Sequence, residues 1–172
     1  MERDASISIE GLNEVFRAMD RAVPKIVEAA NRGIQKGALQ VIADAKVNLR
    51  DNHNVVTGAL RASGRVERID NETIEAGFFD TSNREGYAAY VEYGRRAGGM
   101  PPRSNLAAWA YKKFRLKDWR HAWAIATNLA RRIADRGTTP HPYFGPALEK
   151  NKEYIVKCTQ EAVADCCNNV KL

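Results

Sequence analysis

The chain has 172 residues, a formal net charge of +6, and 44% hydrophobic and 8% aromatic side chains. This composition supports the core of one domain and excludes the disordered class. The N-terminal segment MERDASISIEG has no apolar run after its charges, and no stretch reaches the roughly 18 uncharged apolar residues that span a bilayer. We therefore expect a soluble chain with neither a secretory signal nor a membrane span. Cys158, Cys166 and Cys167 lack a partner at zinc-ligand spacing, and we expect them reduced, in the cytosol.

Apolar residues at three- and four-residue spacing predict helix over much of the first third of the chain. Pro24 interrupts this pattern, and proline kinks a helix interior but is tolerated in a first turn. We therefore predict a short helix up to about residue 20 and a long one from Pro24 to about Leu49. Gly33 and Gly37 lie one turn apart on the second helix, and we expect them to allow close packing against a sheet.

Two strands are predicted next, over Arg65–Ile69 and Thr73–Phe79. Asp70-Asn71 between them favours a tight turn. Residues 87–94, YAAYVEYG, are aromatic and β-branched, so they fit either a strand or a short helix that leads into one. Residues 95–104 are rich in glycine and proline, and we expect a flexible loop there.

Two helices are predicted after this loop, over 105–114 and from Asp118 to the residue before Gly137. Asp118 is a suitable N-cap, because its carboxylate accepts a hydrogen bond from a free backbone N–H. Helical periodicity predicts a buried face on the second helix. That face comprises Trp119, Ala122, Trp123, Ala126, Leu129 and Ile133.

The last predicted helix begins at Pro146, after an extended segment over 138–145. The order of elements indicates an α+β fold, with a small antiparallel sheet packed by long N- and C-terminal helices. A helical insertion at about 95–136 interrupts this plan. No linker divides the chain, so we predict a single domain over 1–172.

Positive charge is concentrated in the insertion. Residues 95–136 contain eleven basic residues, opposed only by Asp118 and Asp135, for a net charge of +9, whereas the remainder of the chain carries −3. The basic residues are Arg95, Arg96, Arg103, Lys112, Lys113, Arg115, Lys117, Arg120, Arg131, Arg132 and Arg136. Such an excess indicates an anionic partner, either nucleic acid or an acidic protein surface, although a solvated helix face is the simpler interpretation. Interleaved aromatic residues fit base stacking, but at helical spacing they also fit a core.

Residue patterns of enzymes are missing from the sequence. It has no phosphate-binding glycine loop, no nucleophile elbow and no His-Glu-x-x-His metal motif, and His53, His121 and His141 are far apart. Carboxylates are scattered singly rather than paired for acid–base work. We therefore predict a protein that is not an enzyme and needs neither a cofactor nor a metal.

Three segments together resemble one known family. They are TGALRAS at 57–63, YAAYVEYG at 87–94 and GTTPHPYFGPAL at 137–148, in this order after a long amphipathic helix. The chain thereby resembles the neck or minor tail-component proteins of tailed bacteriophages, also called the tail-completion family. The matching residues are Thr57, Gly58, Leu60, Arg61 and Ser63 before the sheet, Tyr87, Ala88, Tyr90, Val91, Glu92 and Gly94 in the sheet motif, and Pro142, Phe144, Pro146, Ala147 and Leu148 at the last helix.

The resemblance implies a virion structural protein of the head–tail connection, assembled in the host cytoplasm as a ring of identical copies. Its implied partners are other copies, the neighbouring head-completion and tail-terminator proteins, and DNA that passes through the neck, with no membrane partner. The residues we expect at a partner or DNA interface are Arg95, Arg96, Arg103, Lys112, Lys113, Arg115, Lys117 and Arg120. The alternative hypothesis is a nucleic-acid-binding module that uses residues 95–136.

Overall fold

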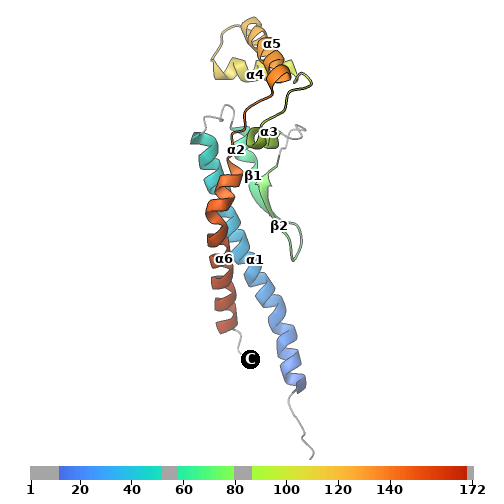
Figure 1. Cartoon of the computed structure of the whole chain (residues 1–172). Coiled ribbons are helices and arrows are strands. Elements are labelled where there is room, and N and C mark those ends of the chain that lie inside the picture. The colour runs from blue at the N-terminus through green and yellow to red at the C-terminus, as the bar shows by residue number, and fades with distance from the viewer. Residues whose placement is uncertain (1–11, 52–57, 80–86, 170–172) are drawn as a thin grey trace, which may run out of the picture.

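The computed structural model describes residues 12–51, 58–79 and 87–169 (Figure 1). The elements in chain order are α1 (Leu12–Asp51), α2 (Ala59–Ser63), β1 (Gly64–Arg68), β2 (Ile74–Phe78), α3 (Tyr87–Tyr93), α4 (Arg103–Lys113), α5 (Trp119–Arg136) and α6 (Phe144–Asn169). Long helices α1 and α6 run side by side, and the strand pair lies against α1 (Figure 1). The α+β class, with a helical insertion before the last helix, is confirmed.

Helix α1 is continuous over 40 residues and includes Pro24, so the predicted break there is wrong. A proline removes one backbone N–H, which leaves the carbonyl of Asp20 without its helical donor. Both Asp20 and Pro24 are exposed, so water can bond to that carbonyl. The apolar periodicity on both sides then keeps one helical axis.

The contact between α1 and α6 is close because Gly33 and Gly37 lack side chains. A Cβ on Gly33 would lie 2.5 Å from Thr159 Cα, and one on Gly37 would lie 2.7 Å from Ile155 Cα. Close packing was predicted correctly, but the expected partner was wrong, because both glycines face α6 rather than the sheet. The main chains of the two helices therefore approach each other directly along this stretch.

The two strands form an antiparallel pair whose register runs from Gly64 opposite Phe78 to Arg68 opposite Ile74. The predicted turn is confirmed: Asp70 Oδ1 accepts hydrogen bonds from the backbone N–H groups of Glu72 and Thr73, both at 2.7 Å. These bonds hold the pKa of Asp70 below its ordinary value. A hydrogen bond connects the turn to α1, because Asn31 Nδ2 donates to the Asn71 carbonyl at 2.7 Å.

Helices α4 and α5 form the insertion, which we call the α4–α5 hairpin and which lies beyond one end of the α1–α6 pair (Figure 1). Its interior is a separate cluster of Ala107, Ala122 and Ala126, with Leu106 and Leu116 packed against it. Within the described residues, α4 and α5 share extensive packing only with each other. The expected Asp118 N-cap is confirmed, since its side chain accepts from Arg120 N.

The two chain segments that connect the α4–α5 hairpin to the body meet at one antiparallel bridge between Arg95 and Thr138. Thr138 N donates to the Arg95 carbonyl at 2.8 Å, and Arg95 N donates to the Thr138 carbonyl at 3.2 Å. Gly94 and Gly137 flank this bridge with φ values of 72° and 75°, where other residues are strained. A Cβ on Gly137 would lie 1.9 Å from the Arg95 carbonyl oxygen, so the close crossing requires glycine.

Candidate interaction surfaces

The three sequence segments that carry the family resemblance meet in one core. Its buried residues are Val41, Ala45 and Leu49 of α1, with Tyr143 and Ala147 at the start of α6. Leu60 from the first segment, Val91 from the second, and Phe144 and Leu148 from the third pack against this cluster. Segments separated by up to 91 positions in the printed sequence thus form a single structural unit. Thr57 lies outside the described residues.

Glu92 joins the second segment to the third. Its Oε2 accepts from Tyr143 N at 2.8 Å and Phe144 N at 2.9 Å, and its Oε1 accepts from Gly145 N at 2.9 Å. These N–H groups precede and begin α6, where a helix has free donors and a partial positive charge. Glu92 is 7% exposed. The carboxylate therefore serves as an N-cap supplied from a distant helix, and residues 87–93 form α3 rather than the sheet motif that the resemblance implied.

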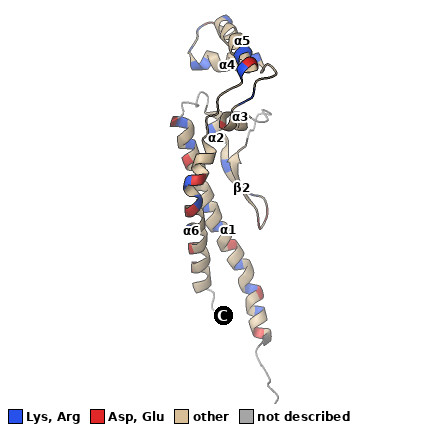
Figure 2. Ribbon diagram, viewed as in Figure 1, with Lys and Arg blue, Asp and Glu red and all other residues tan. Residues whose placement is uncertain are grey.

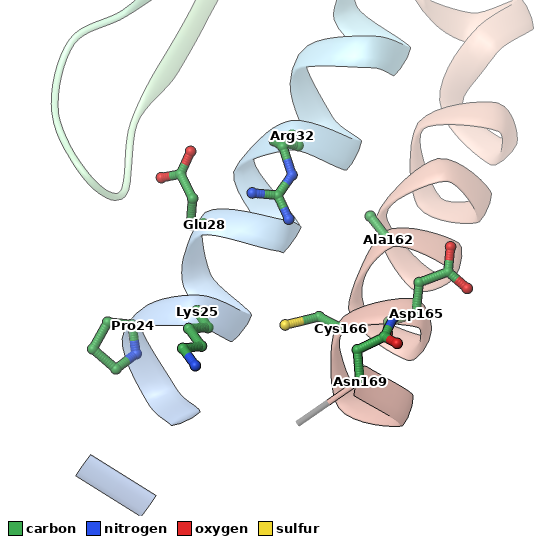
Figure 3. A pocket seen from close by; sticks show the side chains of 8 residues that line it. All are labelled: Pro24, Lys25, Glu28, Arg32, Ala162, Asp165, Cys166 and Asn169. Carbon is green, nitrogen blue, oxygen red and sulfur yellow. The ribbon is translucent and has the colours of Figure 1, made fainter. Parts of the chain in front are cut away.

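Helices α1 and α6 enclose a groove at the end where α6 stops, with a volume of about 720 Å³ (Figure 3). It is lined by Pro24, Lys25, Glu28 and Arg32 of α1 and by Ala162, Asp165, Cys166 and Asn169 of α6. Glu28 is already paired, since its Oε2 lies 2.7 Å from Arg68 Nη1. The groove combines apolar walls with charges of both signs, and in the described part of the chain no cluster of three or more His, Cys, Asp or Glu residues could hold a metal.

An apolar stripe follows α1 past this groove. The two helices are antiparallel, as three contacts show: Asn48 with Tyr143, Asp44 with Asn151, and Gly33 with Thr159. The last residue of α6, Asn169, lines the same groove as Pro24 of α1. The first turns of α1 therefore extend beyond the described end of α6. On them Val15, Phe16, Met19 and Val23 are each 53% to 58% exposed. We call these four residues the α1 stripe.

The expected interface residues divide between two regions. Lys112, Lys113, Arg115, Lys117 and Arg120 come together around the turn between α4 and α5, and all are exposed. Arg95 and Arg96 lie instead in the segment that leaves the body, where Arg95 forms the bridge to Thr138. Arg103 begins α4, and its guanidinium lies over the Trp123 ring at 5.9 Å from the centroid. Lys and Arg positions occur on the ribbons of both helices of the hairpin (Figure 2).

The predicted burial of Trp119 and Trp123 is wrong. Alanines fill the contact between α4 and α5, because Ala107, Ala110, Ala122, Ala126 and Ala130 are fully buried. Four large aromatic side chains remain 36% to 53% exposed on the outside of the hairpin; they are Tyr111, Phe114, Trp119 and Trp123. Small residues let two helices approach closely and leave no room between them for an indole. Helical periodicity predicted correctly that these residues share one face of α5, but it did not predict which part of that face α4 covers.

The sequence reasoning did not find the α1 stripe as a surface. Periodicity placed these residues on the apolar face of the first predicted helices, and no exposed surface was predicted there. The relevant signal is length: α1 has 40 residues and α6 has 26, which at about 1.5 Å per residue leaves about 21 Å of α1 unmatched. Glu92 carried no such signal, because its role depends on a contact across 51 positions.

Comparisons of the chain with protein-family models, with curated proteins and with solved structures found no match. Of the helices that the structure describes, none is long and apolar enough to cross a membrane. The assignment of a role therefore depends on the surfaces themselves and on the segments that form the core.

Proposed function

We propose that this chain is a virion structural protein of the head–tail connection of a tailed bacteriophage, a neck or tail-completion subunit. It acts by assembling with other copies into a ring that joins tail to head. The α1 stripe is the observation that carries this proposal. Four large apolar side chains on one exposed helix face favour a partner protein, since contiguous exposed apolar patches mark interaction sites.

Charges beside the α1 stripe support a second copy as the partner. Glu14, Arg17, Asp20 and Arg21 alternate in sign along the same turns of α1 and are exposed. A segment with both signs offers complementary charges to itself, and rings of identical subunits are built from such repeated contacts. Neighbouring head-completion and tail-terminator proteins are the partners proposed above and below the ring.

The shared core of the three segments gives independent support. The resemblance depended on segments that are weak signals singly, and their residues pack around one cluster. Glu92 bonds the second segment to the third through three backbone N–H groups. A pattern whose members contact one another is better explained by a common structural requirement than by three chance matches.

Electron cryo-microscopy of tailed particles from the source of this sequence tests the proposal directly. We expect density for a ring of this chain between head and tail. Its absence from purified, complete particles would overturn the proposed role.

Substitutions in the α1 stripe test the assembly surface. Phe16→Ser, Met19→Ser and Val23→Ser together should reduce incorporation into particles by at least about tenfold, because they remove most of the apolar contact. The matched control is Leu39→Ser, Ile69→Ser and Val156→Ser, which alters three residues that are 53% to 58% exposed but lie in α1, in the turn between the strands and in α6. Quantitative mass spectrometry of particles measures incorporation, and far-UV circular dichroism verifies the fold. Equal incorporation of both variants would contradict the assignment of this surface.

A further inference from the structure

The outer surface of the α4–α5 hairpin combines exposed aromatic rings with basic side chains, and we propose that it binds single-stranded nucleic acid. Lysine and arginine side chains would neutralise phosphates, and the rings would stack on unpaired bases. This inference does not depend on the proposed assembly role, because it concerns different residues at the opposite end of the molecule (Figure 1).

The charge of the hairpin favours a partner other than this chain. Residues 95–136 carry +9, and the whole remainder of the sequence carries only −3. Each further copy adds +6, so assembly with itself increases the imbalance. Asp118, one of two acids in the segment, is already engaged with Arg120 N at 2.9 Å and His121 Nδ1 at 3.2 Å. The phosphate backbone of a nucleic acid supplies a matching density of negative charge.

The aromatic residues distinguish a strand with bases from a simple polyanion. Tyr111 precedes Lys112, Phe114 precedes Arg115, and Trp119 precedes Arg120, so three of the four exposed rings have a cation next to them in the chain. Tyr111 and Trp119 lie with ring centroids 5.3 Å apart, which places two of these pairs on one surface. Bases and phosphates alternate in the same way along a single strand, where every base offers a face for stacking. Paired bases in a duplex offer no such face.

The turn between the helices retains a cation at a strained position. Helix α4 ends with Leu116 N bonded to the Tyr111 carbonyl at 3.1 Å and Arg115 N bonded to the Lys112 carbonyl at 3.3 Å. This arrangement places Arg115 in the left-handed region, with φ 48°, where helix ends normally carry glycine. Strained residues gather at functional sites. An arginine in place of glycine here costs local stability, which indicates that its charge has a function.

Intrinsic fluorescence provides a specific test, because all three tryptophans of the chain, Trp109, Trp119 and Trp123, lie in the hairpin. The purified full-length protein is titrated with oligo-dT of about 20 nucleotides, its duplex with oligo-dA, heparin and poly-glutamate. We expect oligo-dT to quench tryptophan fluorescence and to bind at least about tenfold more tightly than the duplex or either base-free polyanion. Equal affinity for all four, or tighter binding of poly-glutamate without quenching, would assign the surface to an acidic partner and overturn the proposal.

Charge-reversal variants distinguish binding at the hairpin surface from non-specific attraction of nucleic acid to a positively charged protein. Lys112→Glu, Lys113→Glu, Arg115→Glu and Lys117→Glu together should reduce the slope of log affinity against log salt by about 3, since each phosphate contact in a single strand contributes about 0.7. The control reverses four exposed lysines of α1 and α6 (Lys25, Lys36, Lys152 and Lys157) and should leave that slope unchanged. Trp119→Ala, which keeps every charge, should weaken oligo-dT binding about tenfold and heparin binding not at all. Equal losses in the reversal and control variants would overturn the proposal.

Discussion

Glu92 closes the start of the last helix from outside that helix. Most helices begin with a capping side chain in their own sequence, but the three N–H donors here bond to a carboxylate 51 to 53 positions away. The contact therefore fixes α3 against α6 and stabilises both. A single residue thus determines how two of the resemblance segments meet.

Loss of the Glu92 carboxylate should be costly. Glu92→Ala leaves up to three backbone donors without a partner, and we expect the free energy of unfolding to fall by about 3 kcal/mol. Glu92→Gln retains one acceptor oxygen and should cost about half as much. The control is Glu149→Ala, since that exposed side chain bonds to exposed Lys152 and should change stability by less than about 0.5 kcal/mol. Urea unfolding followed by circular dichroism measures all three, and equal values for Glu92→Ala and Glu149→Ala would contradict the capping role.

Asp44 introduces a pH dependence. Hydrogen bonds from the Asn151 amide and then from Lys150 hold the pKa of this carboxyl below its ordinary value of 3.8. A lowered folded-state pKa stabilises the fold above the ordinary value, and that contribution is lost as the pH falls through the folded-state pKa. Asp44→Asn should therefore cost up to about 1 kcal/mol at neutral pH and progressively less as the pH falls through the folded-state pKa. A pH-independent difference between the two proteins in urea unfolding would show that the charge is irrelevant.

Local residue chemistry was predictable from sequence where it depends on near neighbours. The Asp118 cap and the Asp70-Asn71 turn involve partners within three positions, and both are confirmed. The exposure of Trp119 and Trp123 was not predictable in the same way. Periodicity assigns residues to a stripe, but the alanines of α4 determine which part of that stripe is covered.

At the scale of elements, the positions of the helices were predicted better than the points at which a helix breaks or ends. Periodicity identified α1, α4, α5 and α6, but Pro24 was weighted as a break because local propensity ignores what continues on either side. The glycine pair was correctly predicted to allow close packing, but the predicted packing partner was wrong. The spacing of two glycines shows where side chains are missing, and it does not show which element packs there. The hydrogen-bonded end of α4 had no sequence signal, because arginine occupies the position where glycine is usual.

The α4–α5 hairpin should unfold separately from the body, because its small alanine-rich core is distinct from the core that joins α1 and α6. Tryptophan fluorescence reports the hairpin alone, whereas far-UV circular dichroism is dominated by α1 and α6. We expect the fluorescence midpoint in urea to precede the circular dichroism midpoint. Arg115→Gly should raise the fluorescence midpoint, by about 1 kcal/mol in stability, and leave the other unchanged. Coincident midpoints in both proteins would show one cooperative unit.

At the scale of the whole molecule, the fold class was predictable because the order of elements determines which layers are possible. The arrangement of surfaces was not. Whether the α1 stripe is covered depends on the relative lengths of α1 and α6 and on their register, which arises from contacts between Gly33 and Thr159 across 126 positions. Likewise, sequence located the basic residues but not their division between the α4–α5 turn and the base of the hairpin.

The bridge between Arg95 and Thr138 has a consequence for how this chain can vary in evolution. Besides the hydrogen bond from Gly98 N to the Ala134 carbonyl at 2.8 Å, the connecting segments are bonded to each other at this bridge, held close by Gly94 and Gly137. Whatever lies between those two residues can change in length or be exchanged as a cassette without altering the register of the body. The bridge is therefore a site for modular diversification, at which related chains could acquire different recognition elements on a constant frame.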